Sequence, residues 1–407
     1  MVSVGGVSVE DLAEEFGTPL LVYCEETILA RARAYLEAAP DALLLYSVKA
    51  FPSVPLLRLL EEAGLGADVS TLGELMFARE AGIPGERLVV HGNNKSDEEL
   101  RAAAEAGAAY VVLDAADELE RALEAGVDGL LVRVTPGIDA ETHDAIKTGH
   151  YGSKFGLPPE QARQLLHRAQ ELGAEVAGLH VHIGSQLLET GGARMTIDWL
   201  AAFAAECRAE LGWTPAVVDV GGGLGIQYVP DEAAPSPREF AGALLAELER
   251  AWRLHDLPRP RVVLEPGRSL VGPAGLTLYR VGVVKRASET TTYVAVDGGM
   301  SDNPRPLLYG ARYTALLADR AGEAPVGTFA VCGKHCESGD VLIDRVALPE
   351  PRRGDLLAVP ATGAYTLGMG SNYNAVPRPA AVLVRDGNAR LIRRRETLDD
   401  LLGLEVG

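Results

Sequence analysis

The sequence predicts an α/β protein in which a closed (β/α)8 TIM-like barrel is joined to a second, antiparallel β domain. Short apolar, β-branched runs alternate with helix-like segments between residues 40 and 270, and this alternation is typical of repeated βα units. It provides eight candidate strands, the number that closes a parallel barrel. After residue 272 the pattern changes to short β-rich runs separated by glycine and proline, which indicates a separate sheet. A doubly wound open sheet stays an alternative, because strand number alone does not exclude it.

The expected elements follow from these runs. The barrel strands span residues 43–48, 67–69, 88–90, 110–113, 129–134, 176–182, 216–220 and 262–265. Helices are expected over residues 71–81, 97–106 and 159–172. Strands of the β domain are expected at residues 276–285, 292–296, 328–331 and 356–359. Residues 19–24 are strand-like but precede the barrel. We therefore expect them to join the β domain, which then comprises residues 1–25 and 273–407, beside a barrel of residues 26–272.

The charge balance favours a small-molecule role. The chain has 57 acidic and 38 basic side chains and a formal net charge of −19, which would repel nucleic acid and anionic membranes. The first residues lack the basic start and apolar run of a signal peptide, and no stretch is apolar for long enough to cross a bilayer. We therefore expect a cytoplasmic protein.

The four cysteines do not suggest a disulfide framework at this length. In the cytoplasm their thiols are expected to be reduced. Cys332 and Cys336 flank His335, but zinc sites usually have four ligands at recognisable spacings and no second cluster is nearby. We expect no metal.

Polar residues that could do chemistry follow the predicted strands. Lys49, His91, His182, Gly221 and Glu265 all lie at strand ends, where the catalytic face of a barrel is formed. Asp68 lies within the second strand. A lysine directly after a buried strand can lose solvation, which lowers its pKa and frees the amine to form an imine. The alternative is an ordinary surface lysine.

Two segments could bind an anion. The glycines of Gly221–Gly225 could turn backbone N–H groups toward a phosphate, although a tight turn explains them equally well and the spacing does not match a dinucleotide site. Glu265-Pro-Gly-Arg268 places a carboxylate and a guanidinium at the mouth of the barrel, where an exposed ion pair is the alternative.

Further polar segments could serve either a site or local packing. His180 and His182 point to one face of the sixth strand, because side chains at i and i+2 share a face, and Ser185 adds a hydroxyl nearby. In the β domain, residues 336–340, 363–365 and 371–374 are rich in polar and aromatic side chains. Solvated turns or packed loops are the alternatives there.

Taken together, the segments resemble the fold-type III pyridoxal-phosphate decarboxylases, and most closely the branch that acts on diaminopimelate. The resemblance covers almost the whole chain. The matching segments are residues 15–19, 46–50, 91–96, 182–186, 221–226, 265–268, 302–306, 335–340, 363–365 and 371–374.

The resemblance implies pyridoxal 5'-phosphate as the cofactor. Lys49 would hold it as a Schiff base with Asp68 close by, His182 would stack on its ring, and Glu265 would face the pyridine nitrogen and keep it protonated. The remaining cofactor-binding residues would hold the phosphate: Ser185, Gly221, Gly222, Gly223, Gly267, Arg268 and Tyr365. Lys49, His182, Glu265 and Cys336 would be the catalytic residues.

The resemblance also implies a diamino acid substrate. Arg305 and Tyr309 would bind its distal carboxylate and Glu337 its distal amine, since a planar guanidinium suits a carboxylate and a carboxylate suits an ammonium. Arg268 and Tyr365 would contact the substrate as well.

A homodimer with shared active sites follows from the same resemblance. Cys336 would complete the site of the partner subunit. Lys154 resembles the lysine that pairs across this interface with the residue matched by Asp340.

The implied reaction is decarboxylation of meso-2,6-diaminopimelate to L-lysine and CO₂. Phe51, Arg312 and Val376 depart from the family pattern and leave other substrates open. The alternatives are a decarboxylase of an ornithine, lysine or arginine type, an amino-acid racemase on the same kind of barrel, and a catalytically silent homologue that binds the cofactor.

Overall fold

The computed structural model describes residues 2–136, 153–182 and 184–406. The chain forms two compact units. One comprises Arg31–Gly225 and Ala234–Ser269, and the other comprises Met1–Ala30, Ile226–Ala233 and Leu270–Gly407. We call them the barrel unit and the β unit.

The barrel unit contains eight parallel strands that close on themselves, in the order β10-β11-β4-β5-β6-β7-β8-β9. The strands are β4 Leu43–Ser47, β5 Gly66–Val69, β6 Leu88–Val90, β7 Tyr110–Leu113, β8 Leu130–Arg133, β9 Val176–His180, β10 Val217–Asp219 and β11 Arg261–Leu264. The closed barrel confirms the predicted fold class and is not the doubly wound open sheet. Branched side chains such as Leu45, Val89 and Val263 pack together as a buried apolar cluster of the barrel strands, as expected for a barrel with a filled interior.

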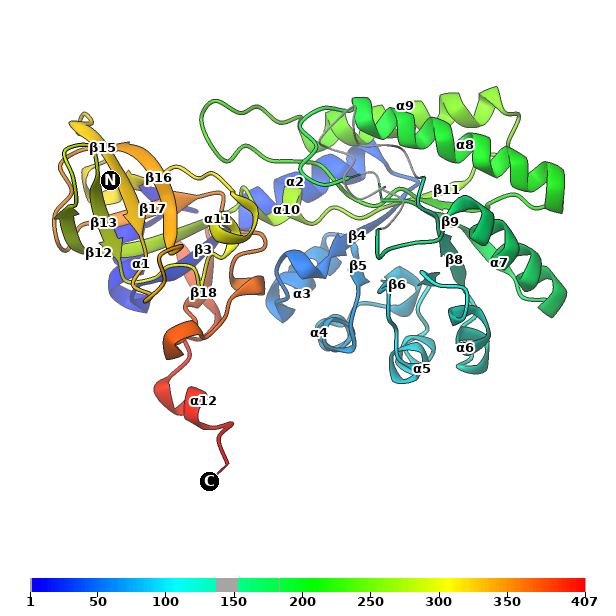
Figure 1. Ribbon diagram of the computed structural model, residues 1–407, viewed down its shortest axis with the longest axis horizontal. Coiled ribbons are helices and arrows are strands. Elements are labelled where there is room, and N and C mark those ends of the chain that lie inside the picture. The colour runs from blue at the N-terminus through cyan, green and yellow to red at the C-terminus, as the bar shows by residue number, and fades with distance from the viewer. Residues whose placement is uncertain (1, 137–152, 183, 407) are drawn as a thin grey trace. The chain divides into compact units, whose positions relative to one another are not determined.

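Helices follow the strands and lie along the outside of the barrel, as α3 to α6 show in Figure 1. They are α2 Glu25–Ala38, α3 Val54–Glu62, α4 Leu72–Ala81, α5 Asp97–Glu105, α6 Glu118–Glu124, α7 Pro159–Leu172, α8 Gly191–Leu211, α9 Pro237–Leu254 and α10 Arg268–Val271, with 3-10 turns at Val48–Ala50 and Gly85–Arg87. The three predicted helices are confirmed. The Thr71 hydroxyl accepts the Glu74 N–H at the start of α4, and a left-handed Gly173 ends α7; both are usual helix boundaries.

The β unit is built on one large sheet with the order β16-β15-β13-β12-β3-β18-β19; in addition, β17 pairs with β12, and β14 pairs with β17. Its elements are β1 Ser3–Val4, β2 Val7–Ser8, α1 Val9–Phe16, β3 Leu20–Cys24, β12 Gly275–Arg286, β13 Thr292–Val296, α11 Arg305–Tyr309, β14 Leu316–Leu317, β15 Gly327–Cys332, β16 Val341–Leu348, β17 Leu356–Pro360, β18 Ala380–Arg385, β19 Asn388–Arg393 and α12 Leu398–Leu402. The expected pairing of the N-terminal strand is confirmed, because β3 lies between β12 and β18. The sheet is mainly antiparallel, with parallel pairs at β13/β15 and β3/β18.

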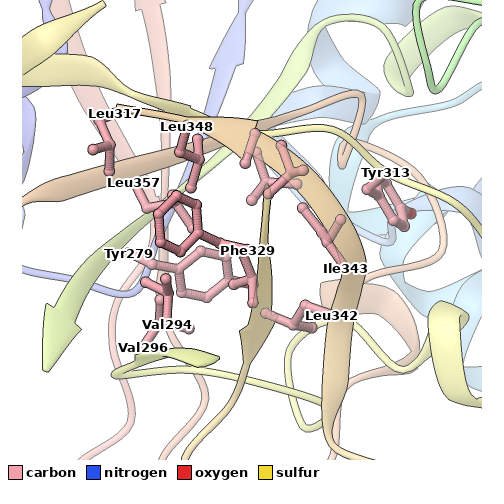
Figure 2. Close-up of a cluster of buried hydrophobic side chains, with 14 of the residues drawn as sticks. Tyr279, Val294, Val296, Tyr313, Leu317, Phe329, Leu342, Ile343, Leu348 and Leu357 are labelled. Carbon is pink, nitrogen blue, oxygen red and sulfur yellow. The ribbon is translucent and has the colours of Figure 1, made fainter. Parts of the chain in front are cut away.

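The core of the β unit is aromatic at its centre. Figure 2 shows the rings of Tyr279 and Phe329 among aliphatic side chains such as Val294 and Leu357 from neighbouring strands. Each such side chain contributes about 1.5–3 kcal/mol when it is fully buried. The Tyr279 hydroxyl donates to the Asp302 carboxylate at 2.5 Å, so this polar group in the core is satisfied.

Within the described ranges, no helix is long and apolar enough to pass through a bilayer.

Candidate active site

Lys49 lies immediately beyond the end of β4, in the short turn Val48–Ala50. Its Nζ is 4.0 Å from Oδ2 of Asp68, and its side chain is 51% exposed. The lysine is therefore at the carboxyl end of the barrel strands, as predicted. It is half-exposed, so the loss of solvation that the strand position suggested is incomplete.

Asp68 is buried in β5 beside Lys49. The Ser47 hydroxyl donates to Oδ2 of Asp68 at 2.5 Å, and Nε2 of His91 is 3.6 Å from Oδ1. The aspartate thus connects the lysine on one strand end with the histidine on another.

Glu265 follows β11 and is the centre of a buried polar cluster. Its Oε1 is 2.5 Å from Nε2 of His91, and its Oε2 is 3.8 Å from Nε2 of His180. Burial alone would raise the pKa of the Glu265 carboxyl, but the adjacent His91 and His180 hold that pKa well below its ordinary value. The cluster therefore keeps a negative charge at the mouth of the barrel.

Asp219 lies at the end of β10 and is a second buried carboxyl group close to Glu265. Burial, and then the charge of Glu265, raise the pKa of Asp219 well above its ordinary value. The Gly221 N–H donates to Oδ1 of Asp219 at 2.8 Å. The pKa values of these two neighbouring carboxyl groups are thus shifted in opposite directions, which favours the charged form of Glu265 and the neutral form of Asp219.

Asp219 has no place among the sequence-predicted site residues, and His180 was noted only as the companion of His182. The available signal was a single polar residue inside each otherwise apolar strand. Donor atoms of His91, His180, Asp219 and Glu265 all lie within 4.8 Å of one another. A metal ion accepts these ligand types, so the absence of a metal stays a prediction.

The glycine run forms a cradle beside this cluster. Gly221 and Gly223 have φ of 69° and 113°, backbone conformations that favour glycine. A Cβ on Gly222 would lie 2.3 Å from the backbone oxygen of Glu265, and one on Gly221 would lie 2.9 Å from Nδ1 of His182. Side chains at these positions would fill the cradle, so its glycines are required by geometry.

His182 follows β9 and is half-buried. Burial, and then the positive charge of Lys49, lower the pKa of His182 well below its ordinary value. Its ring is therefore neutral near pH 7.

The other expected phosphate contacts of the barrel unit lie close by. Nη2 of Arg268 donates to the Ser185 hydroxyl at 3.3 Å. Gly267 approaches Ser47 so closely that a Cβ would lie 2.9 Å from the serine Cβ. These contacts bring the end of β11 against the ends of β4 and β9.

The expected substrate residues lie in the β unit and differ in exposure. Cys336, Glu337 and Tyr309 are exposed. Tyr365 is half-buried and has a left-handed backbone, with φ of 58°. Arg305 is buried, with 6% of its surface exposed.

Two tyrosine rings enclose Arg305. Its guanidinium carbon is 4.4 Å from the centroid of Tyr228, and its Nη1 donates to the Tyr313 hydroxyl at 2.5 Å. The cation–π contact and the hydrogen bond fix the plane of the guanidinium.

Asp340, which the resemblance pairs with Lys154 of the partner subunit, has several partners within its own unit. Its carboxylate is 2% exposed and accepts hydrogen bonds from Met300 N at 2.7 Å, from His335 N at 2.9 Å and from Nδ1 of His335 at 2.8 Å. These contacts satisfy the carboxylate inside its own unit, and the pairing of Asp340 with Lys154 of the partner subunit stays a prediction. The same contacts show that His335 hydrogen-bonds Asp340.

The departures from the family pattern have local explanations. Phe51 is buried, and its carbonyl accepts the Tyr46 hydroxyl at 3.1 Å. Arg312 forms an exposed ion pair with Asp231 at 3.1 Å. Val376 is half-buried, and nothing in the structure explains the absence of an arginine there.

Known proteins share both the sequence and the fold of this chain. Residues 25–272 match the family described as pyridoxal-dependent decarboxylase, pyridoxal binding domain. The chain belongs to the pyridoxal-dependent decarboxylase family. The barrel is its pyridoxal-binding domain, and pyridoxal phosphate is the cofactor.

Whole-length relatives of this decarboxylase include the diaminopimelate decarboxylase of Actinosynnema pretiosum subsp. auranticum, 45% identical over 410 residues with 99% of this chain and 92% of that protein covered. The Bacillus subtilis (strain 168) diaminopimelate decarboxylase is 42% identical, with 99% and 94% covered. The diaminopimelate decarboxylase of M. jannaschii in co-complex with L-lysine has a TM-score of 0.91 at 32% identity, covering 100% of this chain and 99% of that chain. The Vibrio vulnificus lysine/ornithine decarboxylase complexed with putrescine has a TM-score of 0.80 at 26% identity, covering 93% and 97%.

The residues present in the barrel unit fit the decarboxylase cofactor. A buried carboxylate held charged by two histidines suits a protonated pyridine nitrogen. A cradle that a Cβ would fill suits a phosphate approached by backbone N–H groups. A lysine amine is available at the adjacent strand end.

His180 gives a prediction for the pH dependence of folding. Burial lowers its pKa from 6.5 to about 3, so the unfolded chain binds a proton below pH 6.5 that the folded chain does not bind. The stability is therefore present above pH 6.5 and is lost as the pH falls toward 3. In denaturant titrations, the slope of the unfolding free energy is expected to be lower in His180→Asn than in the wild type by about 1.4 kcal/mol per pH unit across the acid range. Exchange of the exposed His167 for Asn is the matched control, and an equal change in both variants would contradict the prediction.

Proposed function

We propose that this protein decarboxylates meso-2,6-diaminopimelate to L-lysine and CO₂ with pyridoxal phosphate, the last step of bacterial lysine biosynthesis. The observation that carries the reaction class is the buried Glu265 carboxylate, which His91 contacts at 2.5 Å and keeps charged. The substrate follows from the relatives, since diaminopimelate decarboxylases match the chain at 41–45% identity over almost its full length.

In this proposal the residues of the barrel unit hold and polarise the cofactor. Lys49 would bind it covalently, Glu265 would keep its ring nitrogen protonated, and the neutral ring of His182 would stack on it. When bound, the cofactor supplies an electron sink for the pair of electrons left when the bond from Cα to the carboxylate breaks. Ser185, Gly221–Gly223, Gly267, Arg268 and Tyr365 would hold the phosphate.

The residues of the β unit would recognise and protonate the substrate. The Cys336 thiol would donate the proton that replaces the lost carboxylate at Cα. The Glu337 carboxylate would bind the distal ammonium, and Arg305 with Tyr309 the distal carboxylate. The fixed plane of the Arg305 guanidinium supports this, because two parallel hydrogen bonds to a carboxylate require such a plane.

We also propose a homodimer in which each subunit completes the site of the other. Leu307, Leu308 and Tyr309 of α11 are 45%, 57% and 65% exposed. Consecutive exposed apolar side chains of this kind are typical of an interaction surface. The exposed Cys336 agrees with a residue that acts on a partner.

The proposed reaction is tested by incubating the purified protein and pyridoxal phosphate with meso-2,6-diaminopimelate, ornithine, lysine and arginine. We expect CO₂ and L-lysine from the first substrate and at most slow turnover of the others. A preference for ornithine would overturn the substrate, and stereoinversion without CO₂ would indicate a racemase. No turnover of any of them would indicate a silent homologue.

Glu337→Gln is expected to raise KM for diaminopimelate by about tenfold, because a hydrogen bond to a charged group contributes about 1.5–3 kcal/mol. Initial rates over a range of substrate concentrations measure the change. Exchange of the exposed Glu289 for Gln, in the turn after β12, is the matched control. Equal KM values for both variants would contradict the role of Glu337.

A further inference from the structure

The loop between β15 and β16 carries both Cys336 and Glu337, and its two ends are tied together. The Gly333 N–H donates to the Asp340 carbonyl, and the Asp340 N–H donates to the Glu337 carbonyl. The Lys334 N–H donates to the carbonyl of Gly298, outside the loop. The loop is thus closed at its base, but these bonds do not by themselves fix the exposed thiol.

A buried pair of side chains fixes the residue before the thiol. Asp340 accepts both the backbone N–H of His335, at 2.9 Å, and its ring Nδ1–H, at 2.8 Å. The His335 ring is 0% exposed and the Asp340 carboxylate 2% exposed. His335 donates two hydrogen bonds to one oxygen of Asp340, and these fix both the backbone and the ring of His335. The direction of the backbone that leads into Cys336 is therefore fixed as well.

Two glycines make room for this pair. A Cβ on Gly333 would lie 2.2 Å from Oδ2 of Asp340, and one on Gly299 would lie 2.6 Å from Oδ1 and 2.7 Å from Nδ1 of His335. The backbone therefore packs directly against the His335–Asp340 pair. Because the backbone packs this closely and the Asp340 carboxylate has its hydrogen bonds, the His335–Asp340 pair is a rigid support for the loop.

A second support comes from the polar segment near the C-terminus. Oδ1 of Asn374 accepts the N–H of Cys336 itself at 2.8 Å. Asn374 has φ of 54°, a left-handed conformation that asparagine tolerates better than most residues. The neighbouring Tyr373 ring stacks on the His335 ring at 6.1 Å between centroids. The two polar segments of the β unit therefore meet at the backbone of Cys336 and at the His335 ring.

We propose that His335, Asp340 and Asn374 are positioning residues that hold the Cys336 thiol and the Glu337 carboxylate in their working geometry. This inference rests on the proposed function, in which Cys336 delivers the proton and Glu337 binds the distal ammonium. A displacement of a reacting group by about 1 Å can lower a rate by about 10²-fold, so such a support has a catalytic consequence without contacting the substrate.

Two matched pairs of variants test the proposal. Asn374→Gly removes the acceptor and keeps the left-handed backbone, whereas Asn374→Asp keeps both. His335→Leu removes the ring donor to Asp340, whereas His335→Asn keeps a donor near the position of Nδ1. In the holoenzyme, the Gly and Leu variants are expected to lower kcat and raise KM, each by about tenfold or more. The Asp and Asn variants are expected to retain most of the activity. All four are expected to bind pyridoxal phosphate, titrated by its absorbance, as the wild type does.

The rate at which a disulfide reagent modifies Cys336 separates this inference from the proposed function. The Cys336→Ser variant identifies which kinetic phase of the reaction with the reagent comes from this exposed thiol. The rate is expected to differ from wild type by about threefold or more in the Gly and Leu variants and to be restored in the Asp and Asn variants. If the proposed substrate is wrong, this pattern persists although diaminopimelate is not turned over. Unchanged thiol rates in all variants, or equal losses within each pair, would overturn the positioning role.

Discussion

Replacement of Lys49 by alanine is expected to lower kcat by about 10³-fold or more, because the variant loses the amine that would hold the cofactor. The structure places this lysine where the cofactor would be held. It follows β4 at the carboxyl ends of the barrel strands, and the buried Asp68 lies 4.0 Å from its Nζ. A surface lysine with no such neighbour would have no role in the reaction.

The covalent link can be measured independently of activity. Borohydride reduction of the wild-type holoenzyme is expected to fix the cofactor on the peptide that contains Lys49, and mass spectrometry locates it. Lys49→Arg keeps a positive charge near Asp68 but cannot form the link, and serves as the matched control. A label on Lys95, which is buried and donates to Glu118 at 3.1 Å, would contradict the assignment.

The Lys49→Ala protein also tests the shared sites of the proposed dimer. Mixed and reassembled with Cys336→Ala, it would form heterodimers in which one site has both the lysine and the thiol. Random reassembly is expected to restore about a quarter of the wild-type activity from two inactive proteins, as follows from a two-fold interface. No recovery after subunit exchange would indicate that each subunit builds its own site.

Much of the barrel could be predicted because its signals are local. Strand ends at Lys49, His182 and Glu265 follow from short apolar runs that stop at a polar residue, and parallel strands bring all their carboxyl ends to one face. The pairing of β3 with β12 was also predictable, since a strand that precedes the barrel needs another partner.

Other features depend on contacts between distant residues, and the sequence does not contain them. In the sequence, Asp219 is one polar residue in an apolar strand. Its coupling to Glu265 is seen only in the fold, where β10 places the two carboxyl groups side by side. The contacts of Asp340 with His335 and with the backbone of Met300 likewise follow only from the fold. Arg305 is expected to bind a carboxylate, but its enclosure by Tyr228 and Tyr313, from other parts of the chain, follows only from the fold.

Glu265→Gln is expected to lower kcat by about 10²-fold or more, because it removes the negative charge that would keep the cofactor ring protonated. The carboxylate is buried, and His91 and His180 hold its pKa well below the ordinary value, so the wild-type group is charged at every pH of interest. The amide keeps the shape and loses the charge. The absorbance of the bound cofactor, titrated with pH, is expected to shift in the variant and measures the effect without turnover.

Asp219→Asn is the matched control for this charge. The pKa of Asp219 is raised well above its ordinary value by burial and by the charge of Glu265. These effects favour its neutral form, for which an amide is the close substitute. Asparagine can still accept the Gly221 N–H at the position of Oδ1. We therefore expect Asp219→Asn to cost less than about tenfold in kcat. If instead it costs as much as Glu265→Gln, the two carboxyl groups carry their charge in the opposite arrangement, and Asp219 would be the anion of the site.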